Sequence, residues 1–323
     1  MATEKNRLLY YLCPLFLLLA SSHLSAEYFQ CKATDGSIAF TDNPGDCASE
    51  EETFVYEPVK RNCSIYQPQP VSGTCEDTQE GFSRLGSFAY HGATGLAFDG
   101  KELWVFPNRS EGTTIKRIKT NGDLITSVDD PHFLSGTRKL LDEHHPRGDF
   151  VNIGGAAYAN GRLWLSSGMG GNYGSLAPNS ASNARRYDRI YKKITGSSSY
   201  SASAHDGCHL WMIWQGQDYA SPNSSMQRLL KVNPVTGAVI RSYPADLGDP
   251  RDATHGLAWD GTHLWHGKEN VLQSISPDTG RVLTSQRIPG ISRISALASD
   301  GCHLYLADFN GKLGKIAISS LRR

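Results

Sequence analysis

The sequence predicts an all-β protein whose main part is a five-bladed β-propeller. Three observations predict it. A ten-residue pattern, typified by GLAWDGTHLW (Gly256 to Trp265), occurs five times along the chain. A strand–turn–strand pattern follows most of the copies, and the last copy is followed by too little chain to complete a blade.

Each copy of the pattern consists of two short apolar runs around a tight turn. The other four are GLAFDGKELW, GAAYANGRLW, ASAHDGCHLW and ALASDGCHLY. Glycine in the turn supplies the positive φ that a hairpin needs, so each copy is expected to form the inner hairpin of a blade. We expect the closing aromatic residues to pack between blades, and they lie roughly 40 to 60 residues apart, as blades with insertions do: Trp104, Trp164, Trp211, Trp265 and Tyr305.

The outer strands of three blades are expected at 114–128, 227–243 and 270–286, where two runs flank an Asn- or Asp-containing turn with glycine. The second blade is irregular. For it the sequence predicts a third strand at Arg185 to Ile194 and a fourth from Gly196 to Ser201.

Ring closure is predicted from the two ends of the repeat region. Only 311–320 follow the last hairpin, which leaves that blade one strand short, and Ser83 to Tyr90 precede the first hairpin as a fourth strand would. Pairing them gives an N-terminal clasp strand and leaves no open edge. The alternative is a six-bladed ring, with a degenerate blade in Asp129 to Asn152.

The first 26 residues have the features of a secretory signal peptide. Lys5 and Arg7 precede the apolar run Leu8 to Ala20, and small residues follow. That run is shorter than the roughly 20 residues that a membrane span needs, and no other segment could span a bilayer. We therefore expect a secreted or periplasmic protein without a membrane span in the mature chain.

Residues 27–48 are expected to form a small N-terminal β-hairpin domain, because two alternating runs flank Asp35-Gly36. Residues 49–81 are expected to be a linker, and 82–323 the propeller. The aromatic start, the central Asp-Gly and the Phe-x-Asp-x-Pro at Phe40, Asp42 and Pro44 resemble the short periplasmic module known as domain of unknown function 4124. That resemblance implies a Gram-negative envelope protein rather than an activity.

Six cysteines remain after signal removal, an even number that fits a disulfide framework in an oxidising compartment. The spacing predicts a bridge between Cys31 and Cys47 and another between Cys63 and Cys75. The alternative to the second is a bridge from Cys63 or Cys75 to Cys302. Cys208 and Cys302 take the same place in two blades that are not neighbours, so they are not expected to pair with each other.

Composition excludes few partners. The 32 basic and 32 acidic residues balance, so the chain has no net positive charge that would attract nucleic acid or an anionic membrane surface. We expect a monomer whose partner is a protein, a glycan or a small molecule.

Candidate ligand residues come from the loop ends of the innermost strands. His255 stands where the other copies have small residues, and His91, Asn152 and Arg293 are expected in the same register. We expect these four to share the channel entrance, on the face opposite the Asp-Gly turns.

A second candidate is the loop sequence DEHHPRGD, the densest cluster of titratable side chains, with Asp142, Glu143, His144, His145, Arg147 and Asp149. Its spacing matches no standard zinc pattern, and a solvated loop is the favoured interpretation. We therefore predict no metal and no cofactor.

No catalytic motif was found in the chain, and several long polar loops are expected on one face. The sequence therefore favours a binding or interaction module. The alternative is a hydrolase or lyase that acts on saccharides or esters at the channel mouth. The chain resembles the broad group of bacterial secreted propellers with weak repeats, which includes lyases, glutaminyl cyclases and interaction modules, so the resemblance implies no single activity.

Overall fold

The structure is a computed structural model of the 323-residue chain. Side chains are described for residues 75, 81–86, 93–106, 115–127, 153–167, 173–178, 200–216, 227–234, 237–244 and 256–321. Strand backbone is described in addition at 28–32, 38–41, 57–59, 87, 107, 128, 180–187, 198–199, 217–218 and 221–226.

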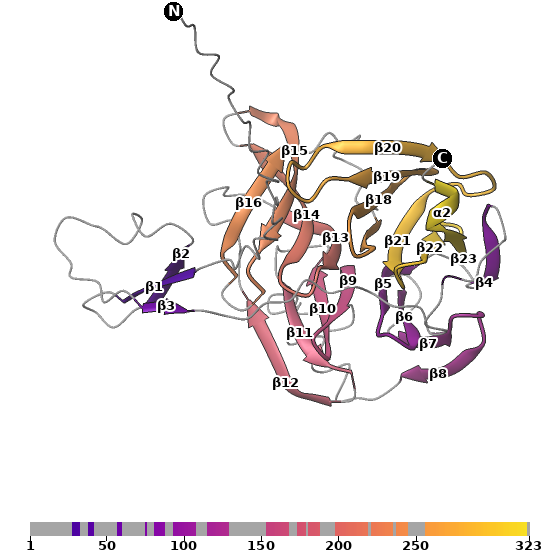
Figure 1. Ribbon diagram of the computed structural model, residues 1–323, viewed down its shortest axis with the longest axis horizontal. Coiled ribbons are helices and arrows are strands. Elements are labelled where there is room, and N and C mark those ends of the chain that lie inside the picture. The colour runs from indigo at the N-terminus through magenta and orange to yellow at the C-terminus, as the bar shows by residue number, and fades with distance from the viewer. Residues whose placement is uncertain are drawn as a thin grey trace, which may run out of the picture.

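Five four-stranded antiparallel sheets form a ring around a central axis (Figure 1). Blade 1 contains β5 (Ala93–Phe98), β6 (Glu102–Pro107), β7 (Ile115–Lys119) and β8 (Leu124–Val128). Blade 2 contains β9 (Ile153–Ala159), β10 (Arg162–Ser167), β11 (Tyr173–Ala177) and β12 (Ser180–Tyr187). Blade 3 contains β13 (Ser198–His205), β14 (Leu210–Asp218), β15 (Ser221–Val232) and β16 (Val239–Pro244).

Blade 4 contains β17 (Gly256–Trp259), β18 (Leu264–Lys268), β19 (Val271–Ile275) and β20 (Val282–Arg287). Blade 5 contains β21 (Ile294–Ser299), β22 (His303–Asp308), β23 (Lys312–Ala317) and the upstream strand β4 (Ser83–Ser87). The innermost strands touch in the order β5, β9, β13, β17, β21 and back to β5. This closed order of five sheets is a five-bladed β-propeller, as the sequence predicts, and not the six-bladed alternative.

The clasp that closes the ring is the pairing of β4 with β23. Leu313 lies opposite Gly86, and Lys315 lies opposite Ser83. The first and last parts of the described propeller thus share one sheet, so ring closure depends on contacts between residues more than 200 positions apart. The strand ends at Ser87, three residues before the expected end.

Two expectations for individual strands are wrong. The third strand of blade 2 is Tyr173–Ala177 and the fourth is Ser180–Tyr187, whereas they were expected at 185–194 and 196–201. Residues 198–201 instead begin the innermost strand of blade 3. The true third strand is only five residues long and follows a glycine-rich stretch, so the sequence shows no clear alternating run there.

The N-terminal segment forms a separate three-stranded sheet. β1 (Tyr28–Lys32) pairs with β2 (Ile38–Thr41) in the expected hairpin. β3 (Glu57–Val59), from the segment expected to be a linker, pairs with the other edge of β1.

The core of the propeller lies between the blades rather than in one central mass. Five clusters of buried apolar residues each join two neighbouring blades. Each cluster contains one aromatic residue of the repeated hairpin, and these five side chains are at most 5% exposed. The prediction that these aromatic residues pack between blades is confirmed.

Small residues begin the repeated hairpin because the innermost strands nearly touch there. A Cβ on Gly256 would lie 2.6 Å from the Leu297 side chain in blade 5. A Cβ on Gly155 would lie 2.5 Å from the backbone nitrogen of Ser203 in blade 3. Any larger residue at these two positions would push neighbouring blades apart.

A disulfide joins Cys75 to Cys302, with the two Cα atoms 5.3 Å apart. The predicted local bridge between Cys63 and Cys75 is therefore wrong, and the alternative bridge to Cys302 is confirmed. The clasp brings the chain just before β4 to the last blade, so Cys302 is within reach of Cys75. Cys208 is also disulfide-bonded, although not to Cys302, as expected. The predicted bridge between Cys31 and Cys47 lies outside the residues with described side chains.

No helix in the described part of the chain is long and apolar enough to span a membrane.

Candidate functional site

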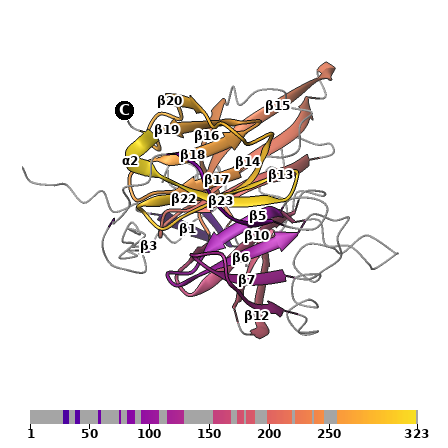
Figure 2. The ribbon, with the colours of Figure 1, turned by 90° about the vertical axis from the view of Figure 1, so that its right-hand side faces the viewer.

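The propeller has two ends, which we call the turn face and the loop face. The turn face carries the Asp-Gly turns that link the two inner strands of each blade, and the short helix α2 (Ile318–Leu321) lies at this end (Figure 2). The Ile318 amide donates to the carbonyl of Cys302 at 2.8 Å, which fixes α2 beside that turn. The loop face is the opposite end, where the chain enters each innermost strand.

The turn face is built from one repeated hydrogen-bond arrangement. In blade 4, Asp260 Oδ1 accepts the amides of Thr262 (2.8 Å) and His263 (2.7 Å), while Oδ2 accepts the indole Nε1–H of Trp265 at 2.7 Å. A glycine with positive φ follows the aspartate, Gly261 in this copy. One carboxylate thus closes the turn and fixes the ring that packs between blades.

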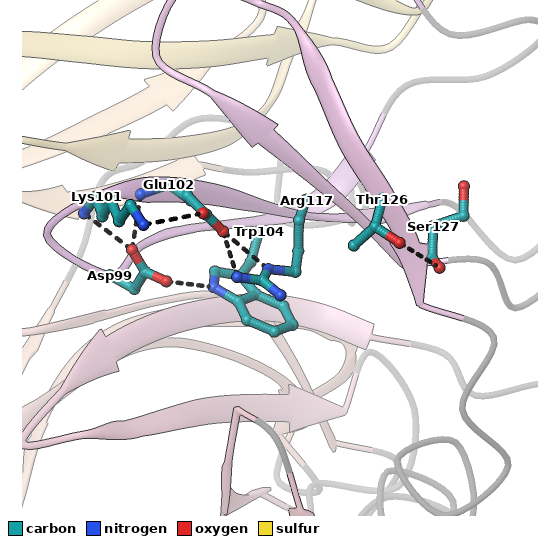
Figure 3. A network of polar contacts seen from close by, with 7 residues as sticks. All are labelled: Asp99, Lys101, Glu102, Trp104, Arg117, Thr126 and Ser127. Atoms are coloured by element: carbon teal, nitrogen blue, oxygen red, sulfur yellow. Dashed lines mark hydrogen bonds and ion pairs between the residues drawn. The ribbon is translucent and has the colours of Figure 1, made fainter.

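The same arrangement recurs in three other blades. In blade 1, Asp99 accepts from the Lys101 and Glu102 amides and from Trp104 Nε1, while Glu102 pairs with Arg117 (Figure 3). Asp206 binds Trp211 in blade 3, and in blade 5 Asp300 accepts from the hydroxyl of Tyr305. Blade 2 has instead a two-residue turn, Asn160-Gly161, with positive φ at both residues.

Histidines extend this arrangement in blades 3 and 5. His209 Nδ1 lies 3.1 Å from Asp206 Oδ2, and His303 Nδ1 lies 3.1 Å from Asp300 Oδ2. Burial alone would raise the pKa of Asp206, but hydrogen bonds from His209 and Trp211 lower it to about 2. The pKa of Asp300 is lowered in the same way, by His303 and Tyr305 against the effect of burial. Both carboxylates are therefore ionised structural acceptors at neutral pH.

Arg293 is the one predicted ligand residue whose side chain is described, and it lies on the loop face just before β21. Its guanidinium stacks over the Phe309 ring, with Cζ 4.0 Å from the ring centroid. The Phe309 amide donates to the Arg293 carbonyl at 2.7 Å, so the two residues are also joined through the backbone. This stacking restricts a side chain that would otherwise be flexible.

The loop that carries Arg293 is held by a fully buried carboxylate. Asp308 Oδ2 accepts the hydroxyl of Ser292 at 3.1 Å, and Oδ1 accepts the amides of Asn310 (2.8 Å) and Lys312 (3.1 Å). Lys312 Nζ donates to the carbonyl of Gly290 at 2.6 Å. Hydrogen bonds at Gly290 and Ser292 therefore hold the segment before β21 to the loop that follows β22.

The other predicted site residues lie outside the described residues. These are His91, Asn152 and His255, together with the loop cluster Asp142, Glu143, His144, His145, Arg147 and Asp149. Their expected convergence with Arg293 at the channel entrance stays a prediction.

Blade 4 holds a buried histidine that the sequence analysis missed. His266 is fully buried, and its Nδ1 lies 3.0 Å from Gln273 Oε1. Burial lowers its pKa to about 4, with a smaller contribution from Lys268, so the ring is neutral at pH 7. The sequence contained a signal for it, since each of the other four copies has an apolar residue directly after the closing aromatic residue.

A cavity lies within the central channel at the turn-face end, with about 30 Å³ of space for solvent. Three consecutive residues at or near the end of every innermost strand line it: Leu96, Ala97, Phe98, Ala156, Ala157, Tyr158, Ser203, Ala204, His205, Leu257, Ala258, Trp259, Leu297, Ala298 and Ser299. Leucines, alanines and aromatic residues make up most of this lining. The polar exceptions are Ser203 and His205 in blade 3 and Ser299 in blade 5.

His205 is a neutral hydrogen-bond donor in this lining. Its Nδ1 accepts the amide of Gly207 at 2.9 Å, so the ring hydrogen is on Nε2. Burial lowers the pKa of His205 to about 4; the Asp206 charge opposes this, and the nearby His209 adds to it slightly. The sequence analysis did not select this residue either.

Across the described side chains, no group of three or more His, Cys, Asp or Glu is placed to hold a metal ion. On the loop face, the side chains of Ser292 and Asn310 can donate and accept hydrogen bonds. Arg293 adds a positively charged guanidinium that is stacked on Phe309. Such groups can bind a ligand.

Comparison with known proteins shows similarity of structure only. No family model matches the chain, and no curated protein matches it in sequence. The solved WD40 β-propeller domain of Doa1 is similar with a TM-score of 0.40 and 11% identity, over 76% of this chain and 100% of that one. The glutaminyl cyclase of Myxococcus xanthus is similar with a TM-score of 0.41 and 10% identity, over 78% of this chain and 94% of that one.

Proposed function

We propose that this chain is an exported β-propeller of the bacterial envelope that acts as a binding module, with its ligand on the loop face. The main support is the bridge between Cys75 and Cys302 on the turn face. Stable disulfides form in oxidising compartments, which fits the signal-like first 26 residues. The resemblance of 28–44 to a periplasmic module supports the same location.

We place the ligand on the loop face because the polar groups of the turn face already hold the structure together. On the turn face, the aspartates, the disulfide and α2 are engaged in holding the blades and the clasp together. On the loop face, Arg293 is restricted by Phe309 and by a well-anchored loop. A guanidinium fixed in this way loses little entropy on binding, so a ligand with carboxylate, sulfate or hydroxyl oxygens suits it.

A ligand screen tests this proposal. Residues 27–323 would be purified from the periplasm and screened by thermal shift against envelope glycans and small anionic metabolites. Ligands that raise the melting temperature would be titrated against Arg293→Ala. The control is Arg281→Ala, because Arg281 is an exposed arginine at the turn-face end of blade 4, just before β20.

Loss of one charged hydrogen-bond donor should weaken binding by about tenfold or more in Arg293→Ala and leave Arg281→Ala unchanged. Equal affinity in the two variants would contradict a loop-face site at Arg293. The same compounds would be checked for turnover. Cleavage of a saccharide or an ester would show that the protein is a hydrolase or lyase rather than a binding module.

A further inference from the structure

The disulfide between Cys75 and Cys302 joins an exposed residue to a buried one. Cys75 is exposed, whereas Cys302 is 7% exposed and lies in the turn between β21 and β22. The Cys302 amide donates to Asp300 Oδ1 at 2.9 Å, and its carbonyl accepts the Ile318 amide at 2.8 Å. The bridge is therefore fixed to the inner part of blade 5 at one end and is exposed at the other.

The chain downstream of Cys75 forms the clasp strand β4, which is held weakly by packing. β4 pairs with β23 over a short length, and the register shifts within this pairing. The apolar side chains of this segment are partly buried: Phe82 packs at the interface of blades 4 and 5, and Leu85 at that of blades 5 and 1. Burial therefore contributes less to holding β4 than it does to holding the inner strands.

The two ends of β4 are attached to the ring in different ways. At the C-terminal end the chain continues into β5, the innermost strand of blade 1, which contacts β21 of blade 5. Upstream of Gly81, the attachment that the structure describes is the bridge from Cys75 to Cys302. Without the bridge, β4 would be tethered at one end, and its effective concentration beside β23 would fall.

We propose that this bridge is a site of thiol–disulfide exchange that controls the clasp, with a dithiol as its reaction partner. A thiolate of the dithiol attacks the sulfur of the exposed Cys75, and Cys302 leaves as a thiolate that takes a proton from water. The second thiol of the dithiol loses its proton, attacks the mixed disulfide and releases Cys75 as a thiol. Two electrons have then passed from the dithiol, which becomes a disulfide, to the two cysteines.

Reduction of the bridge loosens the clasp and leaves the inner strands in place. Exposed disulfides are more readily reduced than buried ones, and the exposed end here is Cys75. Cys302 keeps its backbone hydrogen bonds to Asp300 and Ile318 when the bridge opens, so blade 5 retains its innermost turn. β4 then separates from β23 more often, and closure of the ring depends on the redox state.

Hydrogen exchange with and without a dithiol tests the proposal on the mature chain, residues 27–323. The oxidised protein is treated with dithiothreitol without denaturant, and the free thiols are alkylated and mapped by mass spectrometry. Cys75 and Cys302 should both be alkylated. Amide exchange in β4 should become faster by about tenfold or more, and exchange in β17, β18 and β19 should change by less than about twofold.

The matched variant is Cys75→Ser, which removes the bridge at its exposed end and leaves the buried Cys302 side chain in place. Without any dithiol, β4 of this variant should exchange as fast as β4 of the reduced protein. Dithiothreitol should then change that rate by less than about twofold. Cys208 is also disulfide-bonded, and an effect of its reduction on β4 would appear in the variant as well.

Three results would overturn the proposal. The first is a bridge that dithiothreitol reduces only after urea has unfolded the protein, and the second is an unchanged exchange rate in β4 after reduction. The third is an equal increase in exchange across all five blades, because the bridge would then stabilise the whole fold rather than the clasp. If Cys75→Ser does not fold, the comparison of the oxidised and reduced protein decides the question alone.

Discussion

At the scale of single residues, the aspartate of each Asp-Gly turn explains why the repeat has its form. Asp260 holds two backbone amides with one carboxylate oxygen and the indole of Trp265 with the other. The ring is thereby oriented before it packs against blade 5. Tyr305 takes the same place in blade 5 because its hydroxyl also reaches the carboxylate, at 2.8 Å.

Replacing this aspartate should destabilise the propeller strongly. Asp260→Ala removes three hydrogen bonds and leaves the buried indole N–H of Trp265 without its acceptor, so we expect a loss of roughly 2 to 4 kcal/mol in the free energy of unfolding. Asp260→Asn, whose amide oxygen can still accept the backbone N–H groups, should lose about half as much. Urea unfolding at neutral pH measures both.

The control is Asp278→Ala, in an exposed turn of the same blade. It should change stability by less than about 0.5 kcal/mol. Equal losses at Asp278 and Asp260 would mean that the hydrogen bonds of Asp260 do not stabilise the blade.

At the scale of elements, the clasp strand β4 is less protected than the other three strands of its blade. It is short, and most of its residues are only partly buried, whereas β21, β22 and β23 are largely buried. Gly314 in β23 allows it to pair, since a Cβ there would lie 2.2 Å from the Phe82 ring and 2.5 Å from the carbonyl oxygen of Ser83. The clasp thus requires glycine at this position.

Gly314→Ala should therefore displace β4 while the inner strands stay folded. We expect a loss of about 1 to 3 kcal/mol and faster proteolysis around residues 81–86. Gly86→Ala is the matched control, because a Cβ on Gly86 meets no atom within 4 Å. If both variants were cleaved at the unaltered rate, the clasp described here would be wrong.

The sequence predicted best the elements that are bounded by residues typical of tight turns. The five inner hairpins follow from Asp-Gly or Asn-Gly between apolar runs, and the clasp follows from counting the strands that the last blade lacks. Blade 2 was mispredicted because Tyr173–Ala177 is short and follows a glycine-rich stretch, so it has neither a long alternating run nor a clear turn. The bridge from Cys75 to Cys302 was ranked second because a nearby cysteine is the simpler partner, and only the clasp brings the distant one within reach.

The candidate site was harder to predict than the fold. His266 is polar at a position that is apolar in every other copy, and His205 stands at a position that is aromatic in three of the other four copies. Both contrasts were visible in the sequence. Exposed loops were predicted instead, because long polar loops often carry function. Whether a buried polar residue has a protein partner depends on side chains from other blades, which no local pattern shows.

At the scale of the whole molecule, the two buried neutral histidines should make stability depend on pH. The pKa of His205 and of His266 is about 4 in the folded protein, against 6.5 for an ordinary histidine. Between these values the unfolded chain binds protons that the folded chain does not, so the free energy of unfolding should fall as the pH is lowered from about 6.5 to about 4. Each histidine contributes up to roughly 3 kcal/mol to this fall.

Below about pH 4, protonation of the buried aspartates should lower the free energy of unfolding further. The pKa of Asp206 is about 2, below its ordinary 3.8, so its stabilising contribution is present above about pH 4 and lost as the pH falls toward 2. Urea unfolding at several pH values measures both ranges. His205→Phe should reduce the slope in the upper range by about half, and an unchanged slope would contradict a neutral buried His205.

The N-terminal segment is bridged to the last blade of the five-bladed ring, and we propose that this protein is exported. Non-reducing peptide mapping of the protein recovered from the periplasm of a Gram-negative host tests it most directly. The account predicts a peptide with Cys75 linked to Cys302, and Cys208 linked to a cysteine upstream of Ser83. A peptide that links Cys208 to Cys302, or a free thiol at Cys302, would contradict it.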